Sequence, residues 1–477
     1  MRIAIITESF PPDVNGVAHC VVCVAENLVR NGHHPLVIAP ESAHTTTGAD
    51  SQFRYPVERV PSVPLPGYPT FRLGLPTPRT RRALTRHRTE VVHLASPVAL
   101  GAWGSRVARA MDLPVVAVYQ TDLPNYARAY RLGAVTEAFA WRWLRDIHNA
   151  AARTLAPSSV TAAALHAHGM ERVWLWGRGV DTERFCPVRR DERLRAEIAP
   201  GGEVIVGYVG RLATEKRVDL LAAAAGLPGV RLAVTGGGPM EEELRRAIPS
   251  AVFLGERHGA DLARIYASLD VFVHTGPFET FGQTIQEAAA SGLPVVAPAA
   301  GGPLDLVEDG VTGFLVPPGD GDAFAAAAGR LAADPALRSR FAAAARRRVL
   351  GRTWPALVDE LIGHYAAVLG TETTPARIAR MTEPGSSALR IVRLANYVGP
   401  RSGGMRTALR ELGAGYLAAG HEPVLIIPGR RRGDEQTAQG RVITRYGPVV
   451  PFTGGYRAML RRRRLAALLT ELRPDRL

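Results

Sequence analysis

Two positively charged side chains follow closely on one predicted strand. The segment Gly210-Arg-Leu-Ala-Thr-Glu-Lys216 comes directly after the apolar run Val204–Val209. In an open parallel sheet, ligands bind beyond the carboxyl ends of the strands, so Arg211 and Lys216 are placed to hold a diphosphate. Fixed cations there stabilise the negative charge that a diphosphate leaving group gains in a transition state. The alternative is an ordinary surface ion pair with Glu215.

Lysine usage favours the diphosphate interpretation. The chain has 58 lysine and arginine residues together, and Lys216 is the only lysine among them. A compact ammonium and a planar guanidinium are not interchangeable at a phosphate. One lysine retained in a chain that otherwise uses arginine therefore indicates a functional requirement at this position.

Two glutamates mark the end of another predicted strand. Glu279 and Glu287 are separated by seven residues, and a Phe281-Gly282 step follows the first. We expect Glu279 in a loop at the strand end and Glu287 about two turns into the next helix, whose positive end faces the same crevice. Because carboxylates accept hydrogen bonds from vicinal hydroxyls, the pair suits the two sugars of a nucleotide-sugar.

Glycine-rich turns follow or precede several of the same elements. Gly16 closes the loop Asp13-Val-Asn-Gly before a predicted helix, and Thr235-Gly-Gly-Gly-Pro239 follows a predicted strand. Any one of these turns is by itself a weak phosphate signal. We expect Gly210, Gly236 and Gly238 to line the nucleotide-sugar site.

The elements that must position these residues alternate between strand and helix. The first forty residues form a strand, a loop, a helix and a second strand, which opens a parallel sheet. The pattern predicts an α/β protein with two facing Rossmann-like, doubly wound parallel sheets in residues 1–175 and 176–352. A long helix over residues 353–370 is expected to cross back to the first domain, with a partial third Rossmann-like unit after it.

That third unit repeats the start of the chain. After a linker at 371–387, residues 388–477 align with the first domain when the first forty residues are shifted by 388, without a gap. Gly16 then meets Gly404 and Pro35 meets Pro423, which indicates a truncated second copy. Without a donor site of its own, this copy is expected not to catalyse. It is either one part of a broken tandem fusion or a docking appendage.

Composition and charge limit the partners. The net charge is +14 and the pI about 10.3, but no nucleic-acid recognition motif is present, so no nucleic acid is expected as a partner. Five arginines in Pro78–Glu90, on a predicted helix, favour contact with an anionic membrane surface; a solvated basic face is the alternative. Without a signal peptide or an apolar run long enough to span a membrane, we expect a cytoplasmic protein, peripheral on the inner face of the plasma membrane.

The motifs together resemble the family-4 retaining glycosyltransferases of the GT-B fold. The resemblance covers nearly all of residues 1–370 and includes the spacing of Gly210–Lys216, the E-x7-E pattern from Glu279 to Glu287, and the G-G-G-P turn. The segments Val91–Pro97 and Ala297–Pro303 are most similar to actinobacterial GDP-mannose-dependent α-mannosyltransferases, which act on phosphatidylinositol or glycosyl-diacylglycerol lipids.

The resemblance implies roles for residues at the leaving group. Arg211 and Lys216 would neutralise the donor diphosphate, and Gly16 would let the first domain approach it. The family retains the anomeric configuration by same-face attack, with the leaving phosphate as the base. No metal or other cofactor is implied, because protein cations replace one; Asp320-Gly-Asp322 imitates a metal-binding motif, but we predict a turn and a helix N-cap there.

Other roles concern the two sugars of the donor. Glu279 would bind hydroxyls of the transferred sugar, assisted by the backbone amides of Phe281 and Gly282. Glu287 would hold the ribose.

The acceptor side departs from the family pattern. Members often carry a histidine near the reacting sugar, but here the segment reads Tyr119-Gln-Thr-Asp122, so Gln120 takes that place. Gln120 forms hydrogen bonds but does not carry a proton at neutral pH. Asp122 and His93 are the remaining acceptor-side candidates, and a strand-end histidine such as His93 is more often structural.

Three functions remain open at this point. The first is a retaining transferase that moves mannose from GDP-mannose to a lipid-linked acceptor at the cytoplasmic membrane face. The second uses a UDP-hexose with a lipid or inositol-phosphate acceptor. The third is a protein that binds a sugar nucleotide without catalysis, which the intact set Arg211, Lys216, Glu279 and Glu287 argues against.

Overall fold

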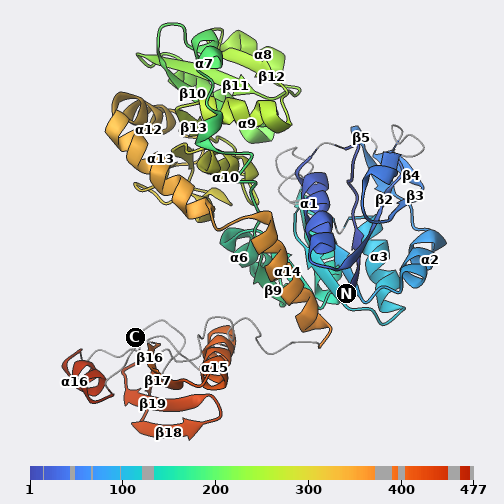
Figure 1. Ribbon diagram of the computed structural model, residues 1–477, viewed down its shortest axis with the longest axis vertical. Coiled ribbons are helices and arrows are strands. Elements are labelled where there is room, and N and C mark those ends of the chain that lie inside the picture. Colours follow the sequence, from blue (N-terminus) through green and yellow to red (C-terminus); the bar gives the residue numbers. More distant parts are fainter. Residues whose placement is uncertain are drawn as a thin grey trace. The chain divides into compact units, whose positions relative to one another are not determined.

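The chain forms two compact units, residues 1–372 and 373–477 (Figure 1). The computed structural model describes residues 1–13, 15–42, 49–65, 68–96, 98–120, 134–370, 389–395, 403–449 and 462–472. Among the helices of these residues, none combines the length and the apolarity that crossing a bilayer requires.

The first unit begins with a seven-stranded parallel sheet in the order β3-β2-β1-β6-β7-β8-β9. Its central strands are short apolar runs buried along their length, as expected for a sheet covered by helices on both faces. The strands are β1 (Arg2–Ile6), β2 (His34–Pro40), β3 (Val57–Val60), β6 (Val91–Leu94), β7 (Val115–Val118), β8 (Arg153–Ala156) and β9 (Val173–Leu175). The other elements are α1 (Gly16–Arg30), the 3-10 helix η1 (Ala49–Gln52), the hairpin β4 (Ser62–Leu65) and β5 (Tyr68–Gly74), α2 (Pro78–His87), α3 (Leu100–Arg109), α5 (Ala134–Ala150) and α6 (Ser159–Ala167).

A second, six-stranded parallel sheet follows in the order β12-β11-β10-β13-β14-β15. Its strands are β10 (Val204–Val209), β11 (Val230–Thr235), β12 (Val252–Gly255), β13 (Val271–Val273), β14 (Val295–Pro298) and β15 (Gly313–Val316). Its helices are η2 (Pro187–Arg189), α7 (Glu192–Ile198), η3 (Thr214–Lys216), η4 (Val218–Ala224), α8 (Glu241–Ala247), α9 (Gly259–Ser268), α10 (Gln283–Ala290), α11 (Pro303–Leu306), α12 (Gly321–Ala333) and α13 (Pro335–Val349). The strand order reverses between β10 and β13, which is where open α/β sheets bind ligands. The two doubly wound sheets confirm the predicted fold class.

The long helix α14 (Trp354–Val368) returns to the first sheet, where it packs on α1 and β7. Its apolar stripe, which includes Trp354, Leu357 and Tyr365, is buried. The indole Nε1 of Trp176 donates to the Leu357 carbonyl at 2.8 Å. This helix therefore ties the end of the second sheet's domain to the first.

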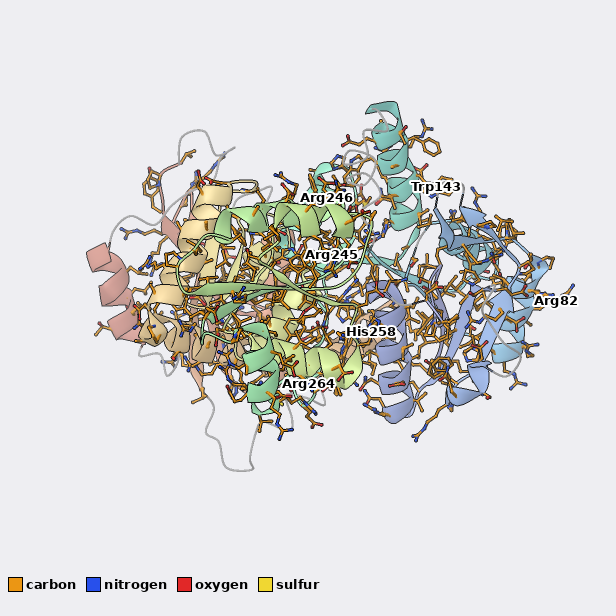
Figure 2. The ribbon with its side chains drawn as sticks, turned by 90° about the horizontal axis from the view of Figure 1, so that it is seen from above. Arg82, Trp143, Arg245, Arg246, His258 and Arg264 are labelled. Carbon is orange, nitrogen blue, oxygen red and sulfur yellow. The ribbon has the colours of Figure 1, made fainter. Side chains whose placement is uncertain are left out.

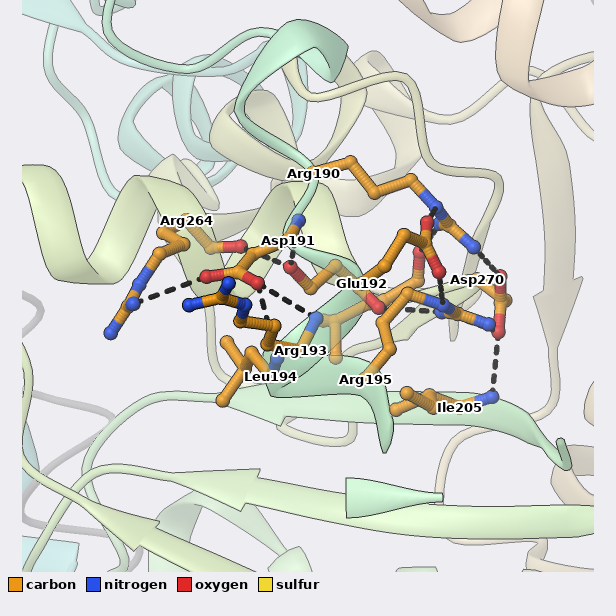
Figure 3. A network of polar contacts seen from close by, with 11 residues as sticks. Arg190, Asp191, Glu192, Arg193, Leu194, Arg195, Ile205, Arg264 and Asp270 are labelled. Atoms are coloured by element: carbon orange, nitrogen blue, oxygen red, sulfur yellow. Dashed lines mark hydrogen bonds and ion pairs between the residues drawn. The ribbon is translucent and has the colours of Figure 1, made fainter. Parts of the chain in front are cut away.

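A polar network fixes the start of the second domain (Figure 3). The Asp270 carboxylate accepts from the Ile205 amide at 2.8 Å and pairs with Arg195 at 3.0 Å. Asp191 caps α7 and pairs with Arg264 of α9 at 3.2 Å. These contacts hold α7 against α9 and against the first residues of β10.

Two short sequence patterns resemble metal-binding or redox motifs: Asp320-Gly-Asp322, and Cys20 and Cys23 with C-x-x-C spacing. The Asp320 carboxylate accepts from the Ala323 amide at 2.9 Å and so caps α12, which confirms the predicted N-cap. Cys20 and Cys23 are free thiols on α1, the first buried and the second partly so. Burial raises the pKa of each thiol, so both stay protonated at neutral pH.

The second unit contains a four-stranded sheet in the order β16-β17-β19-β18, in which only β18 is antiparallel to its neighbour. In it β16 pairs with β17 so that Arg390 lies opposite Glu422. In the first sheet, Arg2 lies opposite His34, so the strand register repeats with the 388-residue offset of the sequence. The elements are β16 (Arg390–Leu394), α15 (Gly403–Ala418), β17 (Glu422–Gly429), β18 (Gly433–Thr437), β19 (Gly440–Tyr446) and α16 (Arg462–Leu472).

Candidate active site

The loops after the neighbouring strands β10 and β13 meet through Lys216. Its ammonium Nζ donates to Oε2 of Glu279 at 2.9 Å, and its carbonyl accepts from the Thr275 hydroxyl at 2.6 Å. Both charged side chains are partly exposed, Lys216 at 23% and Glu279 at 20%. The two residues are 63 positions apart in the sequence, and the structure brings them together at one edge of the sheet, as predicted. We call this place the candidate donor site: the loops after β10, β11 and β13 and the start of α10.

Glu279 is ionised at neutral pH. Burial raises the pKa of its carboxyl, but the charge of Lys216 and its hydrogen bond, together with His274 and Arg178, bring that pKa down to about 2. His274 is buried, with Nε2 3.9 Å from Oε2 of Glu279, and burial lowers its pKa to about 4. The histidine is therefore neutral at pH 7, and the carboxylate is an acceptor suited to sugar hydroxyls.

Arg211 forms the ion pair that the sequence offered as the alternative to phosphate binding. Its guanidinium pairs with Glu215, whose side chain is only 6% exposed, while the Arg211 side chain is 35% exposed. Its carbonyl accepts from the Tyr208 hydroxyl at 3.1 Å. Both predicted phosphate ligands thus have carboxylate partners: Arg211 pairs with Glu215, and Lys216 pairs with Glu279.

Close backbone packing explains the glycines after β10 and β11. Gly236 has φ of +133°, and a Cβ atom there would lie 2.0 Å from the Gly210 carbonyl oxygen. A Cβ at Gly238 would lie 2.4 Å from the Leu212 carbonyl oxygen. The Leu212 amide donates to the Gly237 carbonyl at 2.9 Å. The glycines therefore let the loop carrying Arg211 lie against the loop after β11; their contact with a donor stays a prediction.

Helix α10 begins at a left-handed glycine and carries the second glutamate. Gly282, with φ of +100°, is its N-cap residue, and Phe281 before it is buried in the core. Burial raises the pKa of Glu287 to about 7, although Tyr266 and Gln283 beside it lower that pKa in part. Glu287 therefore gains its charge close to neutral pH, unlike Glu279.

The first domain supplies Gly16 and Gln120 to the same region. Gly16 begins α1, where the Asn15 side chain accepts from the backbone amides of Val17 and Ala18. Gln120 follows β7 and is only 7% exposed; its Oε1 accepts from Nη2 of Arg178 at 2.9 Å. Asp122 lies outside the described residues.

His93 lies in the core of the first domain. Its side chain is buried, and Nδ1 is 2.7 Å from the Tyr365 hydroxyl of α14. Burial lowers its pKa to about 3, so the ring is neutral. The structure separates His93 from the other acceptor-side candidate, Gln120, and favours the structural role over acceptor binding.

Arg178 is a residue that the sequence reasoning missed. It lies in the segment Gly177-Arg178-Gly179 between the two sheets, and it contacts Gln120 while its charge acts on Glu279. The signal was present as a lone arginine between two glycines at the domain boundary. Nothing in the local sequence showed which side chains it would reach.

Comparisons with known proteins agree with this architecture. Residues 14–184 match the family profile described as Glycosyltransferase Family 4, and residues 203–334 match the one described as Glycosyl transferases group 1. Both matches lie in the first compact unit.

Two curated relatives match more than three quarters of this chain. A protein of Mycobacterium tuberculosis (strain CDC 1551 / Oshkosh), named GDP-mannose-dependent alpha-mannosyltransferase, is 50% identical over 381 residues, which is 79% of this chain and 99% of that protein. A protein of the same name from Corynebacterium glutamicum is 42% identical over 77% of this chain and 89% of that protein.

Solved structures show the same fold. Anabaena HepE in complex with UDP superimposes with a TM-score of 0.64 at 24% identity, covering 77% of this chain and 100% of that one. Sucrose-phosphate synthase from Thermosynechococcus elongatus gives 0.65 at 22% identity, covering 78% and 100%. The chain belongs to glycosyltransferase family 4 and is a glycosyltransferase with the GT-B fold.

Proposed function

We propose that this protein is a retaining α-mannosyltransferase that moves mannose from GDP-mannose to a lipid-linked acceptor at the cytoplasmic face of the membrane. The observation that carries the donor half of the proposal is the Lys216–Glu279 contact at the β10/β13 switch point. Relatives at 42–50% identity that are named GDP-mannose-dependent alpha-mannosyltransferases support the choice of donor.

The charges of the candidate donor site suit the departure of a nucleoside diphosphate. When the bond from the sugar C1 to the phosphate oxygen breaks, its electron pair leaves on that oxygen, and Lys216 and Arg211 stabilise the added charge. The acceptor hydroxyl oxygen then bonds to C1 on the same face, and its proton passes to the leaving phosphate oxygen. The ionised Glu279 holds hydroxyls of the transferred sugar, and Glu287 holds the ribose. Because the protein supplies the cations, no metal ion is required.

The membrane half of the proposal is supported by the surface of α2. Arg81, Arg82 and Arg86 line a surface hollow on this helix together with Pro78 and Thr85. Arg86 pairs with an acidic neighbour, but no ion pair involves Arg81 or Arg82 within the described part of the chain. Guanidinium groups of this kind suit anionic lipid headgroups.

Helix α5 carries an exposed aromatic side chain. Both α2 and α5 pack against α3. Figure 2 labels Arg82 on α2 and Trp143 on α5. Phe139 is 65% exposed, and its ring stacks with that of Trp143, with centroids 6.3 Å apart. Aromatic rings beside basic residues are typical of surfaces that enter the interface of a bilayer.

A donor panel tests the proposal. Purified full-length protein would be incubated with total membrane lipid and GDP-mannose, UDP-glucose, UDP-galactose or UDP-N-acetylglucosamine, with and without EDTA. We expect transfer from GDP-mannose into the lipid fraction, an α-linked product by NMR, and no loss of rate with EDTA. Transfer only from a UDP-sugar would refute the donor, a product found only in the aqueous phase would refute the acceptor, and donor binding without transfer would favour a sensor.

A further inference from the structure

The backbone of Arg178 is held from the side of the second sheet. Nε2 of Gln286 donates to the Arg178 carbonyl at 2.8 Å, and Nε2 of Gln283 donates to the Gly179 carbonyl at 3.1 Å. Both glutamines lie on α10, the helix that also carries Glu287. The position of Arg178 is therefore coupled to one wall of the candidate donor site.

The side chain of Arg178 reaches the first domain. Nη2 donates to Oε1 of Gln120 at 2.9 Å, and a Cβ atom on Gly16 would lie 3.0 Å from Nη1. The positive charge also lowers the pKa of Glu279 and of His19. The guanidinium thus lies between the start of α1 and the end of β7, and its charge acts on Glu279 in the loop after β13.

Arg178 has a different kind of partner from the two predicted phosphate ligands. Arg211 pairs with Glu215 and Lys216 pairs with Glu279, so each of those cations has a carboxylate beside it. Arg178 donates to a neutral amide, and no carboxylate forms an ion pair with it in the part of the chain that the structure describes. The net positive charge of this group of side chains therefore comes from Arg178.

We propose that Arg178 binds the donor diphosphate as a third cation, at the phosphate that carries the sugar. This rests on the proposed function, in which Glu279 holds the transferred sugar, because the sugar-bearing phosphate must then lie near Glu279 and so near Arg178. A hydrogen bond from a guanidinium to a phosphate is about twice as strong as one to a neutral amide. Arg178 exchanges Gln120 for a phosphate oxygen when the donor binds.

Nucleotide affinities measured by calorimetry test this assignment without relying on turnover. Full-length wild type, Arg178→Gln and Arg178→Lys would be titrated with GDP and with GMP. We expect Arg178→Gln to weaken GDP about 10- to 100-fold, as for loss of a charge-assisted contact, and GMP less than about threefold. Arg178→Lys should fall between, since it keeps the charge but loses the planar fork. Arg245→Gln removes an equal charge from exposed α8, where Arg245 pairs with Glu241, and should change neither affinity.

Two results would overturn the assignment. The first is an equal loss of GDP and GMP affinity in Arg178→Gln. The second is a Gln120→Ala variant that reproduces the whole loss, with no further loss in the double variant, because Arg178 would then act only by positioning Gln120. UDP and UMP titrations separate this proposal from the proposed function: wild type that binds UDP but not GDP refutes the guanine donor and leaves the same comparison to be made with uridine nucleotides. Wild type that binds no nucleoside diphosphate refutes both.

Discussion

Replacement of Lys216 by alanine removes one cation from the candidate donor site while leaving its surroundings in place. The ammonium is partly exposed, as is its partner Glu279, so the ion pair contributes no more than about 1 kcal/mol to folding. Thermal unfolding of Lys216→Ala should therefore resemble that of the wild type. The cost is expected in the transition state, where negative charge develops on the leaving diphosphate.

The size of that cost follows from Coulomb's law. At about 4 Å and an effective dielectric constant of about 20, an ammonium and a phosphate oxygen interact by about 4 kcal/mol. Each 1.36 kcal/mol corresponds to about a factor of ten in rate, so kcat/KM should fall about 1000-fold. The uncompensated Glu279 carboxylate would repel the same charge and adds to the loss in the same direction.

Initial rates with varied GDP-mannose and saturating membrane lipid would measure kcat and KM separately. Arg217→Ala is the matched control, because Arg217 is the next residue in the chain, is exposed and pairs with Asp219. We expect the control to stay within about threefold of the wild type, as for most exposed ion pairs. If Lys216→Ala kept more than about a tenth of the wild-type kcat, the phosphate role would be refuted.

Three further predictions concern other parts of the first unit. Because burial raises the pKa of Glu287 to about 7 from an ordinary 4.5, the unfolded chain loses this proton first, so the contribution of Glu287 to the free energy of unfolding should fall as pH rises between those values. Urea titrations at several pH values should show this as a fall in the stability of the wild type relative to Glu287→Gln, because the other buried groups, such as Glu8 and His93, titrate equally in both proteins. Gly236→Ala should cost about 2–4 kcal/mol of stability, since its Cβ would meet a carbonyl oxygen, whereas Gly226→Ala, with open space around it, should cost less than about 1. Binding to vesicles that contain phosphatidylglycerol should weaken with salt and with Arg81→Glu/Arg82→Glu, and indifference to both would contradict the membrane proposal.

The sequence was sufficient to predict most of the central strands and the loops that carry chemistry. The run Val204–Val209, for example, forms a strand with the predicted bounds, because buried parallel strands need continuous apolar residues. The strands β3, β8, β9 and β15 were not predicted: charged, threonine or glycine residues interrupt the apolar runs of β3, β8 and β15, and β9 has only three residues. In β9, Trp174 and Leu175 are also exposed, which removes the burial signal.

The choice of ionic partners could not be predicted from the spacing of residues. The neighbour of Lys216 in sequence is Glu215, but β10 lies beside β13, so the nearest suitable carboxylate is that of Glu279. The pKa values of Glu279 and Glu287 diverge for a related reason: the hydrogen bond to Glu279 comes from a charged ammonium, whereas those to Glu287 come from the uncharged Tyr266 and Gln283. Burial and the positions of neighbouring charges depend on how the whole chain packs. The seven-residue spacing between Glu279 and Glu287 carries no information about either.

The sequence by itself determined the residue types, the strand ends at which they lie and the family pattern that joins them. Only the tertiary structure decided that His93 is buried against Tyr365, and that Arg178 donates to Gln120 while its charge acts on Glu279. The physical reason is that periodicity reports which face of an element is apolar. Contacts between elements far apart in the chain depend on strand order and on how the two sheets of the first unit meet.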